Sequence, residues 1–156
     1  MTSHPILVPV DFSDCSSAAL VLAATLADCV KAPLLVLHVV HDPGTLPDYY
    51  AKLRKKKQIH HVEQLATEML AEFLASVASQ QPRLKALRKP EQMRVTGLPV
   101  QRILEVADKC HARMIVMGSH GRTGVSKLLI GSTAIQVVQL SPVPVTVTKG
   151  DALCGN

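Results

Sequence analysis

Short apolar runs, rich in β-branched residues, alternate along this chain with longer stretches in which apolar residues recur at helical spacing. The runs occupy residues 6–10, 34–40, 91–96, 112–117 and 143–148. Runs of this length and composition are typical of buried strands, and the stretches between them are long enough for crossover helices. Right-handed crossovers place such helices on both faces of a parallel sheet. The sequence therefore predicts a Rossmann-like α/β fold, with a doubly wound, five-stranded parallel sheet and helices on both faces.

Four helices are expected between these strands. Ser13 is suited to cap the first helix, and small or apolar residues recur at helical spacing over residues 18–26. The second helix runs from about residue 50 to Gln80, after a loop that contains prolines. The third covers residues 100–110, and the fourth begins at residues 131–132. Each helix would then return the chain to the start of the next strand.

Length and composition limit the number of domains and the cellular compartment. The chain has 156 residues, of which 47% are hydrophobic, enough to bury a core without disulfides, so we expect a single domain over residues 1–156. No apolar stretch approaches the roughly 18 residues that cross a bilayer, and no secretory leader is evident. The four cysteines form no Cys-x-x-Cys pair, as is typical of reduced thiols. These features predict a cytoplasmic protein with no membrane segment and no metal site.

A glycine-rich segment follows the fourth predicted strand. Four of the eight glycines fall within residues 118–131. Glycines can adopt positive φ and let a backbone approach a ligand closely, and the N-terminus of the next helix attracts anions. Ser119 and Ser132 add hydroxyl donors, and Arg122 and Lys127 can neutralise charge. The segment therefore predicts a cradle for a phosphate group.

Other polar or backbone groups should meet this cradle at the carboxyl ends of the strands, where doubly wound folds bind ligands. Asp11 follows the first strand and offers a carboxylate for the hydroxyls of a ribose. Its alternative role is that of a turn former before the helix that begins after Ser13. Val39 and Val40 end the second strand, where their backbone groups could pair with the edge of a heterocycle. Gly97 is expected at the same edge.

These residues resemble the universal stress proteins of the nucleotide-binding branch, whose signature is Gly-x2-Gly-x9-Gly-Ser/Thr. Gly118, Gly121, Gly131 and Ser132 match that signature in type and spacing. The resemblance extends over nearly the whole chain, because the family's five strands find counterparts at residues 8–13, 37–40, 95–99, 115–121 and 142–145.

The resemblance implies a fold like that of the adenine nucleotide α-hydrolases and a site for ATP, with or without Mg²⁺. It implies that Pro9, Asp11 and Val39 surround the adenosine. It further implies that the phosphates or their approach are held by Met117, Gly118, His120, Gly121, Arg122, Gly131, Ser132 and Thr133. It also implies a homodimer in which the last strand, between Val143 and Val147, pairs with its twin. The chain would then serve as a stress-response or signalling module that depends on bound nucleotide.

Efficient catalysis is not expected. The sequence lacks the Gly-x4-Gly-Lys-Ser/Thr loop that supports most NTP hydrolysis, and it contains neither a Ser-Gly-Gly-x-Asp-Ser turn nor a His-x-Gly-His signature. Binding without efficient turnover is therefore the main hypothesis. The alternative from the enzyme class is a slow ATPase or an autophosphorylating protein that uses Ser119 or Ser132 as the acceptor.

The net charge of +5 is concentrated in one segment, because five of the 17 basic residues lie within residues 52–57. Such a run is typical of a solvated helix face or loop. Two Tyr, two Phe and no Trp leave few rings to stack on bases, which disfavours a nucleic-acid partner. A third hypothesis is therefore an interaction module that presents residues 52–57 to an acidic partner.

Overall fold

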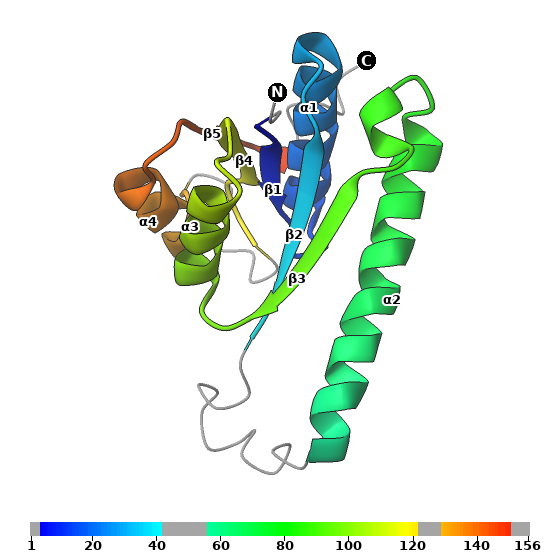
Figure 1. The fold of residues 1–156 in the computed structure, drawn as a ribbon, viewed down its shortest axis with the longest axis vertical. Coiled ribbons are helices and arrows are strands. Elements are labelled where there is room, and N and C mark those ends of the chain that lie inside the picture. Colours follow the sequence, from blue (N-terminus) through cyan, green and yellow to red (C-terminus); the bar gives the residue numbers. More distant parts are fainter. Residues whose placement is uncertain (1–3, 42–55, 122–128, 151–156) are drawn as a thin grey trace.

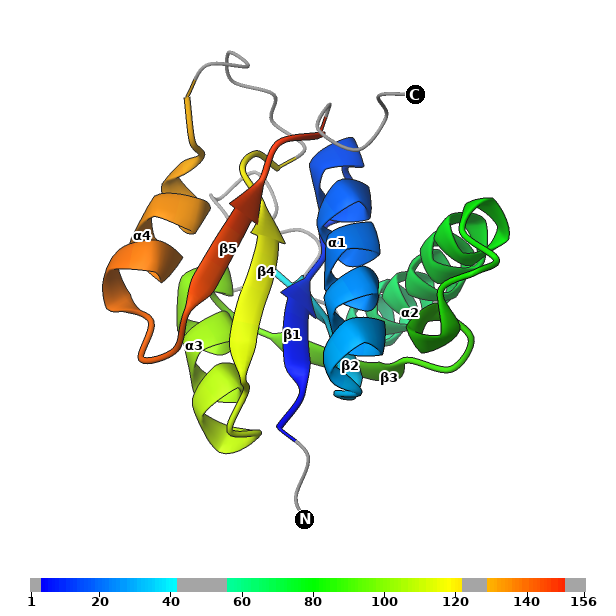
Figure 2. The same ribbon diagram turned by 90° about the horizontal axis from the view of Figure 1, so that it is seen from above.

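The chain forms a five-stranded parallel sheet between two layers of helices (Figures 1 and 2). The computed structural model describes residues 4–41, 56–121 and 129–150, with side chains from residue 61 onward in the second range. The strand order is β3-β2-β1-β4-β5, with every pairing parallel. The elements in chain order are β1 (Ile6–Pro9), α1 (Asp14–Val30), β2 (Leu34–Val40), α2 (Lys56–Gln80), the 3-10 turn η2 (Lys85–Leu87), β3 (Glu91–Thr96), α3 (Pro99–Lys109), β4 (Met114–Gly118), α4 (Ser132–Leu140) and β5 (Val145–Thr148). The predicted doubly wound fold is therefore confirmed.

Two apolar cores lie on opposite faces of the sheet. Alternate residues of a strand face opposite ways, so Ile6 and Val8 pack toward α1 and α2, whereas Leu7 packs toward α3 and α4. Figure 2 shows these two helix pairs on either side of the strands. The first four residues of β2 are buried, as its continuous apolar run predicts. Burial on both faces thus explains the apolar runs of β1, β2 and β4, whereas the edge strand β3 is mostly exposed.

The bounds of β2 and β3 agree with the sequence prediction, whereas β4 and β5 begin later than predicted. β2 and β3 begin and end at the predicted residues. β4 begins two residues later than predicted, because the amide of Ala112 donates to the carbonyl of Ala107 in the turn that ends α3. β5 begins at Val145 rather than at residue 143, because Pro144 has no N–H and contributes only its carbonyl, to the amide of Ile115.

The helices follow the predicted spacing with small shifts. Ser13 caps α1 as expected, since its hydroxyl accepts a hydrogen bond from the amide of Ser16 at 3.2 Å. α3 starts one residue earlier than predicted, with Pro99 in its first turn. α2 is described from Lys56, and the predicted start near residue 50 lies outside the described residues. No helix in the described ranges is both long enough and apolar enough to cross a bilayer.

A carboxylate on α1 fixes the connection between α2 and β3, which the sequence analysis did not anticipate. Asp28 accepts hydrogen bonds from the amides of Lys85 at 2.7 Å and of Ala86 at 2.9 Å. Leu87, 4% exposed, packs into the core on the same side. η2 is therefore held against α1 by two charge-assisted hydrogen bonds and one buried side chain.

Asp28→Ala should lower the free energy of unfolding by about 1–3 kcal/mol, because it leaves two backbone amides without their acceptor. Urea unfolding followed by circular dichroism measures this loss. Glu72→Ala is the matched control, since Glu72 is an exposed carboxylate on α2. Equal stability of the two variants would contradict the assigned role of Asp28.

Candidate functional site

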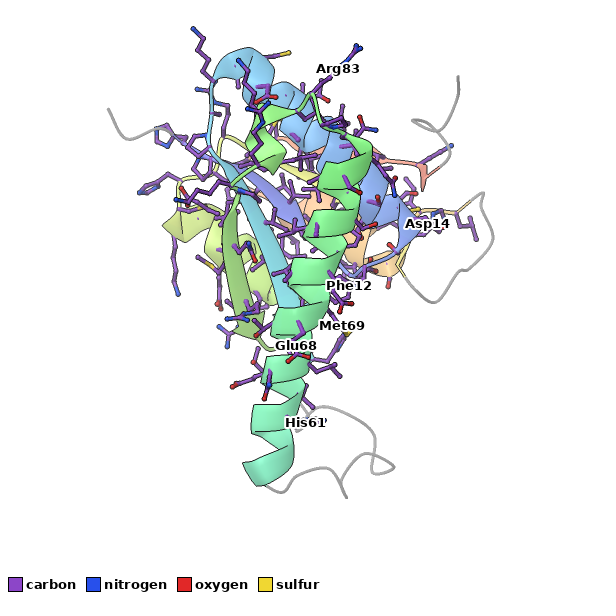
Figure 3. All side chains as sticks on the ribbon, turned by 90° about the vertical axis from the view of Figure 1, so that its right-hand side faces the viewer. Phe12, Asp14, His61, Glu68, Met69 and Arg83 are labelled. Atoms are coloured by element: carbon purple, nitrogen blue, oxygen red, sulfur yellow. The ribbon has the colours of Figure 1, made fainter. Side chains whose placement is uncertain are left out.

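A cavity of about 490 Å³ opens at the carboxyl ends of β1, β2 and β4. The start of α4 forms one wall, and Val62, Leu65 and Met69 of α2 contribute another. Phe12, from the turn after β1, and Met69, near the middle of α2, both line the cavity, and both are labelled in Figure 3. The described residues of the predicted site all line this cavity: Pro9, Asp11, Val39, Met117, Gly118, His120, Gly121, Gly131, Ser132 and Thr133. Arg122 and Lys127 lie outside the described residues.

Asp11 both shapes the turn after β1 and faces the glycine segment. Its Oδ1 accepts hydrogen bonds from the amide of Ser13 at 3.1 Å and from the Ser13 hydroxyl. The turn-forming role considered for Asp11 is therefore confirmed. Its Oδ2 is directed toward Gly121, where an added Cβ would lie 2.7 Å from that oxygen. The carboxylate thus sits between the β1 turn and the glycine segment.

The described glycines of the glycine segment do not use the positive φ that glycine permits. Gly97 alone among all the described glycines has a positive φ, at 146°, and it lies before α3. Gly118 is needed for a steric reason instead, because a Cβ there would lie 2.8 Å from the backbone carbonyl carbon of Cys15. The absence of a side chain at Gly118 lets the first turn of α1 pack against the end of β4.

Two amides of the predicted cradle are used within the protein. The Ser119 amide donates to the carbonyl of Thr148, and the Gly131 amide donates to the carbonyl of Ser119, both at 2.7 Å. These bonds hold the two ends of the glycine segment together and attach it to β5. The part of the cradle that remains is the N-terminus of α4, which begins at the cavity without a side-chain cap. Its first amides and its helix dipole favour an anion.

The buried Ser119 and the half-buried His120 form a polar pair beside this helix end. The Ser119 hydroxyl lies 2.8 Å from Nδ1 of His120, and Ser119 is 1% exposed. Nε2 of His120 is buried and has no hydrogen-bond partner. A buried polar atom without a hydrogen-bond partner costs free energy. This nitrogen is therefore available to form a hydrogen bond beside the cavity. Of the two serines considered as phosphate acceptors, only Ser132 is exposed.

An aromatic cluster that the sequence analysis did not predict lies beside the cavity, and two of its rings, Phe12 and His38, line it. Phe12 has a φ of 67°, and its ring lies 4.4 Å from that of His38 and 5.6 Å from that of Phe73, between ring centroids. His38 donates from Nδ1 to the carbonyl of Val10 at 2.8 Å. The only available signal was the position of Phe12, directly after Asp11 at a strand end. The cluster connects the β1 turn to α2.

The described lining contains one acidic group and no basic side chain other than histidine. Asp11 is the carboxylate, and His38, His41 and His120 are the imidazoles. The described lining therefore offers no lysine or arginine to an anionic ligand. The described part of the lining is suited to a mostly apolar ligand with an anionic end at α4.

The universal stress protein family model matches residues 2–149, so the chain belongs to that family. It is 29% identical to the universal stress protein YxiE of Bacillus subtilis over 149 residues, covering 94% of this chain and 99% of the relative. It is 31% identical to a universal stress protein of Mycolicibacterium smegmatis over 93% of this chain, but spans 45% of that longer relative. Among solved structures, the universal stress protein UspA from Lactobacillus plantarum is similar, with a TM-score of 0.69 at 25% identity over 93% of this chain and 97% of that one.

Gly118→Ala should lower the free energy of unfolding by about 1–3 kcal/mol, because the new methyl group would meet the backbone of α1. Gly121→Ala is the comparison, since its methyl group meets only the end of the Asp11 side chain, which can rotate away. Urea unfolding of the two variants tests the difference. A loss at Gly121→Ala as large as that at Gly118→Ala would contradict it.

Proposed function

We propose that this chain binds ATP in the cavity at the carboxyl edge of the sheet and acts as a stress-response or signalling module whose state depends on the bound nucleotide. The observation that carries the proposal is the convergence of four separate segments on one cavity. These segments are the β1 turn, the end of β2, the end of β4 with its glycine segment, and the start of α4. In this proposal the whole chain acts as one domain.

The adenosine fits the apolar part of the cavity. Val39 is half-buried at the end of β2, and Met117 is 6% exposed at the end of β4. A purine between these side chains would bury apolar surface on both sides. In this proposal Oδ2 of Asp11 accepts hydrogen bonds from ribose hydroxyls, since Oδ1 already accepts hydrogen bonds from the amide and hydroxyl of Ser13.

The phosphates fit the N-terminus of α4. The uncapped first turn supplies backbone amides, and Ser132 and Thr133 add hydroxyls. The unpartnered Nε2 of His120 would gain an acceptor if the pair with Ser119 shifted toward a phosphate oxygen. Arg122 and Lys127 lie in the segment that joins Gly121 to α4 and would supply the positive charge. Within the described ranges no cluster of three side chains could hold a metal ion, so Mg²⁺ would enter on the phosphates.

The expected affinity is micromolar. Three or four charge-assisted hydrogen bonds contribute about 1.5–3 kcal/mol each, and association costs at least about 4 kcal/mol. When the burial of the purine is added, the free energy of binding is near −7 to −8 kcal/mol, which corresponds to a Kd of about micromolar order. Such a site would respond to nucleotide supply.

Relatives of the same fold support a nucleotide ligand. One universal stress protein structure, with a TM-score of 0.58 and 23% identity, is a complex with cAMP. Another, from Archaeoglobus fulgidus, with a TM-score of 0.62 and 24% identity, is a complex with dAMP. An adenine nucleotide is therefore the ligand class that we propose for this chain. Free thiols at Cys15, Cys29 and Cys110 favour a cytoplasmic location within the same proposal.

Calorimetric titration of the nucleotide-stripped protein with ATP should give a Kd of about micromolar order. Asp11→Asn should weaken ATP and adenosine alike by about tenfold, because the charged acceptor for the ribose is lost while the amide oxygen can preserve the Ser13 turn. Asp14→Asn is the matched control, since Asp14 is exposed in the first turn of α1 and does not line the cavity. Absence of heat at millimolar ATP, or an equal loss in both variants, would contradict the proposal.

We also propose that two copies pair along β5. Among the described strands, β5 is hydrogen-bonded to β4 and to no other strand. The adjacent α4 exposes Ile135 at 42% and Val138 at 50%, which are three residues apart on one helix face. Pairing across a two-fold axis would cover both the strand edge and this apolar face.

Sedimentation velocity should therefore find a dimer, and Val138→Glu should shift it to monomer by burying a charge in the interface. Gln136→Glu introduces the same charge at an exposed position on a different face of α4 and should leave the dimer intact. A monomeric parent protein, or a dimer unaffected by Val138→Glu, would contradict this assembly.

A further inference from the structure

Basic side chains are concentrated in the loops at the amino ends of the strands. These loops lie at the opposite edge of the sheet from the cavity. Seven exposed basic residues lie in three loops or at their borders, and we call them the basic edge: Lys31 between α1 and β2, Arg83, Lys85, Arg88 and Lys89 between α2 and β3, and Lys109 and Arg113 between α3 and β4. Figure 3 shows Arg83 far from His61, which lies near the other end of α2.

The topology brings these loops together although they are far apart in sequence. The strand order β3-β2-β1-β4 places the starts of four strands side by side, at a spacing of about 4.8 Å. Backbone hydrogen bonds join these starts, from the amide of Arg113 to the carbonyl of Pro5 at 2.8 Å and from Ile6 to Pro33 at 2.9 Å. In Figure 1, β2 and β3 both begin near the top, where α2 also ends. The cations therefore follow one edge of the sheet.

The basic edge is held rigidly and is not neutralised. η2 is fixed to α1 by Asp28, whose two oxygens are bonded to backbone amides rather than to basic side chains. In the described part of the chain the only ion pair joins Arg102 to Glu105, outside this edge. Asp28, Glu91 and Asp108 are the acidic residues in or beside the three loops, so positive charge is in excess there.

A second cavity, of about 430 Å³, lies at the same edge. Ala107 and Ala112, 0% and 5% exposed, contribute buried apolar lining, together with the half-buried Val143. The polar lining consists of His4, Asp108, His111 and Arg113, and His4 donates from Nδ1 to the carbonyl of His111 at 2.8 Å. This cavity can accept one apolar side chain, with one cation, Arg113, and one carboxylate, Asp108, in its lining.

We propose that the basic edge binds an acidic protein segment that inserts one apolar side chain into this second cavity. Acidic side chains complement the seven cations, and an apolar anchor in a pocket supplies the localised binding energy typical of such interfaces. A nucleic-acid backbone would use the charge but not the apolar lining. The described phenylalanines, Phe12 in the turn after β1 and Phe73 on α2, pack against each other, so they provide no stacking surface at this edge.

Fluorescence anisotropy with a labelled peptide of alternating Glu and Asp around one central Leu tests the proposal on the full chain. The combined variant Arg83→Gln, Lys85→Gln, Arg88→Gln and Lys89→Gln should weaken peptide binding by at least about tenfold. The matched control, Lys52→Gln, Arg54→Gln, Lys55→Gln and Lys57→Gln, removes the same charge elsewhere and should change binding by less than about twofold. Unchanged urea midpoints verify that both variants fold.

Two further comparisons separate this partner from other anions. A peptide with Ser in place of the central Leu should bind more weakly to the unaltered protein, because the apolar anchor is lost. Saturating ATP should leave peptide binding unchanged, because the two cavities lie at opposite edges. Equal loss in both combined variants, equal binding of the Leu and Ser peptides, or tighter binding of duplex DNA or of phosphatidylglycerol vesicles than of the Leu peptide would overturn the proposal.

Discussion

The close packing of the first turn of α1 against the end of β4 is the contact on which the site depends. It is possible only because Gly118 has no side chain where Cys15 passes. The same contact places the Asp11 turn, which precedes α1, opposite Gly121. A larger residue at Gly118 would separate the β1 turn from the glycine segment. Helix packing and the shape of the cavity therefore share one steric requirement in this protein.

Some amides of the glycine segment form hydrogen bonds within the protein, so fewer groups remain for a ligand. The amides of Ser119 and Gly131 close the segment and attach it to β5, which makes the cavity wall part of the sheet. What remains for a ligand is the first turn of α4, the carboxylate of Asp11 and the buried Nε2 atom of His120. A site built in this way would bind phosphate mainly through a helix N-terminus rather than through a loop of free amides.

The two edges of the sheet differ in their chemistry. The carboxyl edge has a cavity whose described lining holds one carboxylate, three imidazoles and many apolar side chains. The amino edge has seven exposed cations and a smaller cavity with apolar lining. Because all five strands are parallel, every loop that follows a strand lies at one edge and every loop that precedes one lies at the other. One ligand at each edge could therefore be bound at the same time.

The sequence by itself determined the element order, the bounds of β2 and β3, the cap at Ser13 and the family, because apolar periodicity and the glycine spacing are local properties. The order of the parallel strands placed Asp11, Val39 and Gly118 at one edge, and the family resemblance supplied the other residues that line the cavity. Only the tertiary structure decided that Gly118 is required by contact with α1 rather than by its φ. It also decided that two amides of the cradle form hydrogen bonds within the protein. The contacts of the Phe12 ring with the rings of His38 and Phe73 were likewise visible only there. The tertiary structure alone brought the cations of three loops to one edge. The physical reason is that steric contact and hydrogen-bond partners between distant segments depend on packing, which no local pattern encodes.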